Sequence, residues 1–359
     1  MPPSAPAPVH FDALAAACMA AELQAALCPG RIQAALLVDE NSLGLEIYAH
    51  GGGQGTRRQL LLCAAPHTAR VHLVEHKLRR GVETETPLLL LVRKYLRDAV
   101  LMAVTQPDPY ERVLRFHCEH KQHGATTLLI ELIGRQANLF LLRPDGRILE
   151  CLHRHAAPQR PDAAGAGRLL LPGRPYTPPP PQAKLPPVDD GSPDYYERLA
   201  AVLHTPGKLA KALVDSVAGL SPSAARELAW RAAGSPDAPA TAANVLALVG
   251  ALQALWEPLR TGRWQPGNLV AGGEVVGFAP YPAHGGDAFV PTPTFSAAVA
   301  AYYAAPPVGR GAPAAQGDTS PAPVPGQASA DPYAQPRANA ATALRRARAG
   351  IERRLGGLA

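Results

Sequence analysis

The sequence predicts an α+β protein in which an antiparallel β domain precedes an all-helical module. Short apolar runs bounded by turn residues recur through positions 11–155, which is typical of antiparallel strands joined by tight turns. A proline-rich stretch at 156–187 interrupts this pattern, and apolar residues at helical spacing dominate beyond it. The 359 residues, 47% of them hydrophobic, suffice for two or three domains with separate cores.

A helix followed by a group of strands is expected in the first 65 residues. Positions 1–10 carry four prolines, which remove backbone donors, so a disordered tail is predicted there. The alanine-rich run at 11–27 has apolar residues at helical spacing and predicts an amphipathic helix. Three apolar-biased runs then predict the strands of an antiparallel meander: 31–38, 42–48 and 59–65.

A second helix and a second meander complete the predicted β domain, which spans 11–155. Thr86 can cap a helix and Pro87 suits its first position, so a helix is predicted from there to position 99. Four further apolar runs predict the strands of the second meander: 113–119, 126–133, 138–142 and 147–152.

Composition divides the rest of the chain. The connector at 156–187 contains four consecutive prolines and is expected to be extended. Apolar faces on either side of a short turn predict a pair of helices within a module at 188–240. The segment 241–303 begins as a helix, turns to strand character and is expected to pack on the β domain. Two segments remain: a low-complexity linker (304–332) and the start of a coiled-coil helix (333–359).

The net charge of +6 is not by itself a nucleic-acid signal. Positions 337–359 hold six arginines against one glutamate, which accounts for +5 of the total. Any RNA-binding surface must therefore come from local clustering. Five cysteines without a C-x-x-C pair, no export leader and no apolar run long enough to span a bilayer predict a cytoplasmic protein with no membrane partner.

Several short motifs resemble those of one family. The runs LVRKYL at 91–96, YERVLRF at 110–116 and IELIGRQAN at 130–138 resemble the LRKH, DR and E-x-M-G-R-x-S-N signatures of the NFACT amino-terminal domain. The stretch at 171–179 resembles the proline-rich connector of that family, and GLSP at 219–222 resembles its helix-hairpin-helix element. The resemblance extends from about position 11 to the end of the chain.

The resemblance implies a fold and a function. NFACT proteins have an amino-terminal fold similar to the DNA glycosylase MutM (Fpg), a helix-hairpin-helix module, a coiled coil and an NFACT-R domain, before which this chain is expected to end. They bind large ribosomal subunits that hold peptidyl-tRNA, and they recruit tRNA, alanyl-tRNA in bacteria, for untemplated tailing of the stalled peptide. Because the ribosome performs the chemistry, the chain is expected to be an RNA-binding adaptor without a cofactor and not an enzyme.

The motifs also depart from the family pattern. Tyr95 stands where the family has His, and Arg97 begins a replacement of its Gly-rich helix end. Gln136 and Ala137 replace His-Ser, and Glu111 replaces Asp. Glu keeps the charge but moves it by one methylene, and a bidentate contact tolerates such a shift poorly. The last change therefore bears on which tRNA is chosen.

Cationic side chains in the first 135 positions are expected to converge on one face that binds RNA phosphates. Guanidinium groups suit this task because their planar fork matches phosphate geometry, although a single surface charge is more often only solvated. Arg112 is the foremost candidate, and Glu111 could orient it, accept from RNA donors or simply form a cross-strand ion pair. The candidate RNA-binding residues are Arg79, Arg80, Arg93, Lys94, Arg97, Glu111, Arg112 and Arg135, with Lys77 and Arg115 as further cations.

Five more candidates come from the motifs that resemble NFACT. Gly219 and Ser221 would present backbone amides at a helix start to a phosphate, although Ser221 could equally serve only as a helix cap. Glu131, Gly134 and Asn138 belong to the run at 130–138. For Gly134 and Asn138 the structural alternative is that they mark a bulge and a tight turn.

Two histidine-rich runs have the composition of a metal site. In the first, His117, Cys118, His120 and His123 lie close together in sequence, but strand alternation points His117 and Cys118 to opposite faces. The run CLHRH at 151–155 is a weaker case. No metal is therefore expected.

Two other functions compete with the adaptor hypothesis. A MutM-like glycosylase or lyase could use the secondary amine of Pro2 to form a Schiff base, but Pro3 stands where that family has a catalytic Glu. A surface adhesin is the second alternative, because NFACT proteins are often labelled fibronectin-binding. The missing export signal and the free cysteines disfavour it.

Overall fold

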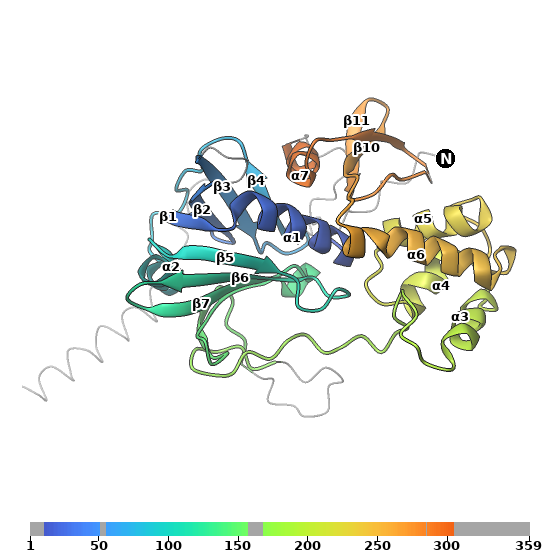
Figure 1. Ribbon diagram of the computed structural model, residues 1–359, viewed down its shortest axis with the longest axis horizontal. Coiled ribbons are helices and arrows are strands. Elements are labelled where there is room, and N and C mark those ends of the chain that lie inside the picture. Colours follow the sequence, from blue (N-terminus) through green and yellow to red (C-terminus); the bar gives the residue numbers. More distant parts are fainter. Residues whose placement is uncertain (1–10, 51–54, 157–167, 285, 305–359) are drawn as a thin grey trace, which may run out of the picture. The chain divides into compact units, whose positions relative to one another are not determined.

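The computed structural model describes four stretches of the chain: 11–50, 55–156, 168–284 and 286–304 (Figure 1). The predicted tail at 1–10, the coiled-coil start at 333–359 and all but the first residue of the linker at 304–332 lie outside them. The described residues form a large sheet, a group of four longer helices and a small three-stranded sheet. The fold is therefore α+β, as predicted.

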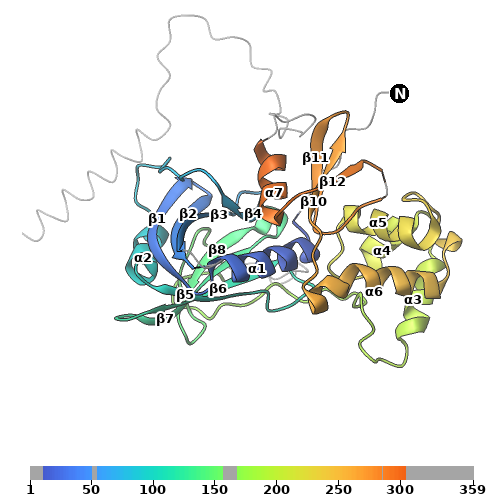
Figure 2. The same cartoon turned by 45° about the horizontal axis from the view of Figure 1, so that its top comes forward.

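One antiparallel sheet contains the strands of both predicted meanders, in the order β4-β3-β2-β1-β5-β6-β7-β8-β9 (Figures 1 and 2). The two meanders are joined where β1 pairs with β5, with Gly30 opposite Leu101 and Arg31 opposite Val100. Strands β4 and β5 were not predicted, and β5 is the strand that unites the sheet. The bounds are β1 Gly30–Asp39, β2 Ser42–Ala49, β3 Thr56–Cys63, β4 Arg70–Val74, β5 Val100–Thr105, β6 Val113–His120, β7 Gly124–Glu131, β8 Asn138–Leu142 and β9 Ile148–Cys151.

Side-chain caps start the two helices of this domain. The Asp12 carboxylate accepts a hydrogen bond from the Ala15 amide at the start of α1 (Ala13–Leu27). The Thr86 hydroxyl accepts one from the Leu89 amide at the start of α2 (Pro87–Leu96), as the sequence predicted. Helix α2 ends three residues earlier than expected, because Arg97 is extended and Asp98 has a positive φ of 68°.

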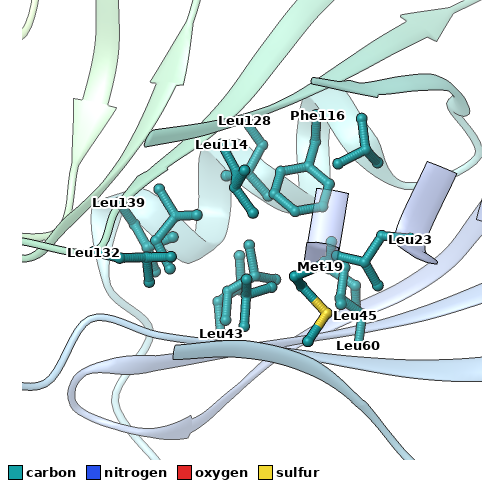
Figure 3. Packing of buried hydrophobic residues seen from close by; sticks show 14 of the residues in the cluster. Met19, Leu23, Leu43, Leu45, Leu60, Leu114, Phe116, Leu128, Leu132 and Leu139 are labelled. Carbon is teal, nitrogen blue, oxygen red and sulfur yellow. The ribbon is translucent and has the colours of Figure 1, made fainter. Parts of the chain in front are cut away.

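Helix α1 forms the centre of the first hydrophobic core. Ten of its fifteen residues are buried, and many are alanines, whose small side chains let neighbouring elements approach closely. Figure 3 shows Met19 and Leu23 of α1 between side chains from both halves of the sheet. Those neighbours are Leu43, Leu45 and Leu60 from the first half and Leu114, Phe116 and Leu128 from the second. Burial of each such side chain contributes roughly 1.5–3 kcal/mol.

Four helices build a second core (Figure 2). They are α3 (Tyr195–Leu203), α4 (Leu209–Ser216), α5 (Pro222–Ala233) and α6 (Val245–Thr261). The sequence placed the helix at 242–260 in the segment that returns to the β domain, but Leu248, Leu252 and Leu255 of α6 pack in this second core. Leu14 of α1 belongs to the same core, so the helical module packs directly against the start of α1.

The end of the described chain returns to the first core. Strands β10 (Gly267–Ala271), β11 (Glu274–Ala279) and β12 (Ala288–Pro291) form a sheet in the order β11-β10-β12, and α7 (Phe295–Ala304), which was not predicted, follows. Phe278 of β11 and Phe295 of α7 join the first core. Phe11 packs against both, with its ring centroid 5.9 Å from each of theirs, and the two rings are 5.7 Å from each other.

The proline-rich connector is anchored to the sheet. The Glu131 carboxylate, which is completely buried, accepts two hydrogen bonds of 2.6 Å from the Arg168 guanidinium and one of 2.7 Å from the Tyr176 hydroxyl. Leu170 of the same segment packs with Leu129 and Phe140 in a third core. The connector therefore covers part of the sheet in addition to linking two domains.

Arg168→Ala is expected to lower the free energy of unfolding by about 3 kcal/mol, because a buried carboxylate that loses its partner remains charged and desolvated. Urea denaturation measures the loss. Lys211→Ala, which breaks the exposed ion pair with Asp215 on α4, serves as the control and should cost at most about 0.5 kcal/mol. Equal losses in the two variants would contradict the anchoring role of Arg168.

Candidate nucleic-acid interface

A cleft of about 320 Å³ opens where α1, the β5–β6 loop, the connector and the start of α5 meet. It brings together residues that are far apart in the sequence. Its polar lining includes Asp12, Tyr110, Glu111, Arg112, Gln136, Gln182, Lys184 and Ser221. Two cations and two carboxylates thus face one small space beside the GLSP turn.

The starts of two helices are joined at this cleft. The Ser221 hydroxyl accepts a hydrogen bond from the Ala224 amide at the start of α5 and donates one of 2.6 Å to the Asp12 carboxylate. Asp12 in turn caps α1. Burial raises the pKa of Asp12, and the hydrogen bond from Ser221 and the positive charge of Arg112 oppose that rise.

The turn before α5 requires glycine. Gly219 has a φ of +75°, which L side chains rarely adopt. A Cβ at that position would also lie 3.1 Å from the Ala13 Cβ and 3.3 Å from the Tyr110 carbonyl oxygen. Gly219 therefore lets the turn approach both α1 and the β5–β6 loop closely.

Hydrogen bonds hold the β5–β6 loop in place. The Gln106 side-chain amide donates to the carbonyl oxygens of Ala13 at 3.0 Å and Glu111 at 2.7 Å. The Glu111 carboxylate accepts a hydrogen bond of 3.0 Å from Gln182 of the connector. Within the described stretches, however, the Arg112 guanidinium has no hydrogen bond and no ion pair, so it is available to a ligand.

Four of the predicted site residues line the cleft: Glu111, Arg112, Gly219 and Ser221. The other predicted cations do not line it. Of the cations expected to converge on one face, the cleft therefore contains Arg112 alone. The Arg93 side chain donates to the Ala35 carbonyl and pairs with Glu85. The Arg80 side chain donates to nearby backbone carbonyls, and the Arg135 side chain donates to the His67 ring. The remaining three, Arg79, Lys94 and Arg97, are exposed.

Several residues of the cleft were not predicted from the sequence. An Asp before an alanine-rich run is a capping signal, so Asp12 could have been recognised as the start of α1. Its contact with Ser221 could not, because the two residues are 209 positions apart. Gln182 and Lys184 lie in the proline-rich connector, where no periodic pattern indicates which side chains face the sheet.

The family model for the NFACT N-terminal and middle domains matches residues 12–306. The chain belongs to the NFACT family. The Rqc2 homolog RqcH of Bacillus subtilis (strain 168) is 27% identical to this NFACT protein over 234 residues. That alignment covers 64% of the chain and 38% of RqcH, so the match spans well under half of the relative.

Solved structures share the fold. The N-terminal part of the fibronectin/fibrinogen-binding protein of Streptococcus suis is 24% identical with a TM-score of 0.63, and the match covers 82% of this chain and 99% of that one. The fibrinogen binding protein of Staphylococcus aureus is 20% identical with a TM-score of 0.61, covering 82% and 98%. At these identities the likeness establishes the fold alone.

The NFACT motif at 130–138 has structural roles in the described chain. Glu131 holds the connector through Arg168. Asn138 is completely buried, and its side-chain amide pairs with both the N–H and the C=O of His153. Gly134 has a φ of +47° and begins a short 3₁₀ helix. Asn138 therefore joins the ends of β8 and β9 instead of marking a simple turn.

The histidine-rich runs lie on strands and turns as expected. Cys118 is buried, whereas His117 is partly exposed and its ring contacts the Thr105 hydroxyl at 2.9 Å. The His120 ring accepts hydrogen bonds from the amides of Gln122 and His123 at the hairpin turn. Among the residues with described positions, no three His, Cys, Asp or Glu side chains form a metal-binding group, and no helix is long and apolar enough to cross a membrane.

Asp12→Ala is expected to lower the free energy of unfolding by about 1–2 kcal/mol, because α1 loses its cap and Ser221 loses its acceptor. Asp12→Asn should cost less, since Asn caps helices as well as Asp does. Urea denaturation of both variants at pH 7 provides the test. A larger loss for Asp12→Asn than for Asp12→Ala would contradict the capping role.

The stability difference between Asp12→Asn and the unaltered chain should depend on pH. Because burial raises the pKa of Asp12, the stability that its protonation provides is fully present below the usual value of 3.8 and is lost as pH rises through the raised pKa. The Asn variant does not titrate at this position. The free energy of unfolding of Asp12→Asn should therefore rise relative to that of the unaltered chain as the pH increases from 4 to 7. A difference in stability that stays constant over this range would exclude a raised pKa of Asp12.

Proposed function

We propose that this NFACT protein is an RNA-binding factor of ribosome quality control. In this role it engages stalled large ribosomal subunits that carry peptidyl-tRNA, and it recruits tRNA, alanyl-tRNA in bacteria, for untemplated carboxy-terminal tailing. The protein acts as a cytoplasmic adaptor and not as an enzyme, because the ribosome supplies the chemistry. The relationship to RqcH supports this proposal.

The observation that carries the proposal is the juxtaposition of Glu111 and Arg112 with the GLSP turn in one cleft. Arg112 offers a guanidinium that forms no hydrogen bond and no ion pair within the described chain, a group well matched to phosphate. The start of α5 adds the partial positive charge of a helix N-terminus. Together they favour a phosphate at the mouth of the cleft.

Glu111 extends the recognition beyond phosphate. Gln182 orients its carboxylate, which can accept hydrogen bonds from base amino groups or ribose hydroxyls. A cation and an anion side by side thus offer complementary contacts to the backbone and to an unpaired nucleotide. Of the alternatives open at the sequence level for Glu111, contact with RNA donors is the one we propose.

A second candidate, binding of an extracellular matrix protein, has one observation in its favour. The similar structure from Streptococcus suis carries the name fibronectin/fibrinogen-binding protein. Nothing in the lining of the cleft indicates binding of a matrix protein. Its polar residues and the Arg112 guanidinium suit an anionic ligand. The lyase alternative depends on Pro2, which lies outside the described residues.

Arg112→Ala is expected to weaken tRNA binding at least fivefold, which corresponds to about 1 kcal/mol, because one charge-assisted contact is lost. The fold should be retained, since the guanidinium forms no hydrogen bond or ion pair in the described chain and interacts with Asp12 through its charge. Filter binding with tRNA and co-sedimentation with large subunits measure the effect. Arg143→Ala at the exposed β8–β9 turn is the matched control. Unchanged binding by Arg112→Ala, with the fold verified by circular dichroism, would contradict the proposal.

Binding to tRNA should weaken as salt rises, because each phosphate contact releases counterions. In Arg112→Ala the slope of log Kd against log salt concentration should be smaller by about 1, because one phosphate contact is lost. Titrations at several salt concentrations give both slopes. Affinity that does not depend on salt would exclude phosphate recognition.

A further inference from the structure

Two aromatic rings are stacked on the surface of the helical module, outside the lining of the cleft. Trp230 lies on α5, and His284 lies in the loop between β11 and β12. Their ring centroids are 4.5 Å apart and their planes differ by 9°, so the imidazole lies parallel to the indole. Trp230 is partly buried, whereas His284 is exposed. The imidazole is therefore the outer ring of the pair.

Hydrogen bonds fix the outer ring. The buried Glu227 carboxylate accepts hydrogen bonds of 2.7 Å from the His284 backbone N–H and 2.8 Å from its Nδ1. It also accepts one of 2.7 Å from Arg231, whose guanidinium donates to the Pro282 carbonyl in the same loop. Burial acts to raise the pKa of Glu227, but the bonds from His284 and Arg231 outweigh burial and lower it. The ionised carboxylate keeps the imidazole proton on Nδ1 and the ring in one orientation.

One face of the His284 ring is open. The Trp230 indole covers the other face, and Glu227 occupies the Nδ1 edge. The His284 side chain is nevertheless 45% exposed, so its accessible area lies on the open face and at the Nε2 edge. Within the described residues, Nε2 forms no hydrogen bond. A planar ligand can therefore stack on the imidazole while its contacts with Trp230 and Glu227 stay intact.

Two cations lie near the stacked pair. Arg226 precedes Trp230 by four residues, so the two side chains lie on the same face of α5. Arg226 pairs with Asp237 at 3.1 Å, and Lys208 at the start of α4 pairs with the same carboxylate at 2.9 Å. An exposed carboxylate in the β11–β12 loop, that of Asp287, offsets part of the remaining charge. The cations can therefore assist a ligand, but most of the binding must come from the ring.

An open imidazole held parallel to an indole suits a nucleobase. Unpaired RNA bases stack on aromatic side chains, His included, and every base has a π face, so such a contact tolerates any sequence. The pair also belongs to the helix whose start lines the cleft. Trp230 follows Ser221 by nine residues, which corresponds to roughly 13 Å along the helix axis. A short single strand of RNA bound at the cleft can span that distance.

We propose that the pair of His284 and Trp230 is a stacking platform for an unpaired base of bound RNA. The base packs on the open face of His284 and continues the stack of rings, while Arg226 and Lys208 lie near the adjoining phosphates. This inference rests on the proposed RNA-binding function and adds a contact that reads no sequence. Because Glu227 fixes the ring before RNA binds, little side-chain entropy is lost.

Fluorescence anisotropy of a labelled oligoadenylate of six nucleotides tests the contact. His284→Asn removes the ring, although its amide can still donate to Glu227, and it should weaken binding at least fivefold. His284→Phe is the matched control, because it keeps an aromatic ring over Trp230, and its affinity should stay within twofold of the unaltered chain. Urea denaturation verifies that both variants are folded.

An abasic strand with the same number of phosphates separates stacking from charge. It should bind His284→Asn and the unaltered chain equally, because it has no base to stack. Stacking also releases no counterions, so the slope of log Kd against log salt concentration for the oligoadenylate should be the same in His284→Asn and the unaltered chain. Arg112→Ala, in contrast, should have a smaller slope.

NMR of the unaltered chain gives a readout that needs no variant. A base stacked on His284 should shift the imidazole ring protons upfield, whereas the abasic strand should leave them in place. Imidazole resonances that do not move with the oligoadenylate would overturn the platform, even if His284→Asn does not fold. Equal affinity of a folded His284→Asn and the unaltered chain for the oligoadenylate, or an equal loss of affinity for the abasic strand, would overturn it as well.

The tests distinguish failure of the platform from failure of the proposed function. If Arg112→Ala weakens tRNA binding but His284→Asn binds the oligoadenylate like the unaltered chain, RNA binding stands and only the platform is lost. An unaltered chain that binds tRNA but not the oligoadenylate leads to the same conclusion. An unaltered chain that binds neither would contradict both.

Discussion

A buried hydrogen bond between Ser221 and Asp12, next to the packing of Leu14 in the second core, joins the helical module to the β domain at the starts of α5 and α1. Each residue also caps its own helix, so loss of either partner would leave backbone donors and a buried polar group unsatisfied. Gly219, two residues before Ser221, lies close to Ala13 and Tyr110 at the same junction. The GLSP turn thereby supplies one wall of the cleft.

Burial separates the motif residues that maintain the fold from those that remain free for a ligand. Glu131 and Asn138 are completely buried, and every polar contact they make is to the protein itself. A buried carboxylate requires such partners, because desolvation of an unpaired charge costs several kcal/mol. Arg112, by contrast, lines the cleft without a hydrogen bond or ion pair in the described chain, and its charge acts on Asp12. The motifs that resemble NFACT signatures therefore contain both structural anchors, at 130–138, and a candidate binding residue, at 110–116.

The β5–β6 loop connects two concave surfaces. Gln106 ties the loop to α1, and Gln182 ties Glu111 to the connector, so the loop is held from two sides. Tyr110, between these ties, lines both the polar cleft and a second concave surface, which Pro109, Val188 and residues of α6 between Gly250 and Arg260 also line. A ligand in either surface would therefore contact the same side chain. This arrangement gives a physical route by which occupancy of one surface could affect the other.

Local chemistry in the sequence determined the cap at Thr86, the seven strands with clear apolar patterns and the helix pair around GLSP. It also indicated Glu111, Arg112, Gly219 and Ser221 as candidate site residues, although not that they share a cleft. Strands β4 and β5 were not predicted, and β5 takes its place by pairing with β1 about 70 positions earlier, which no local pattern encodes. Only the tertiary structure brought Ser221 to Asp12, paired Glu131 with Arg168 and placed Arg112 in the cleft without a hydrogen bond or ion pair in the described chain, because contacts between distant residues depend on how the cores pack.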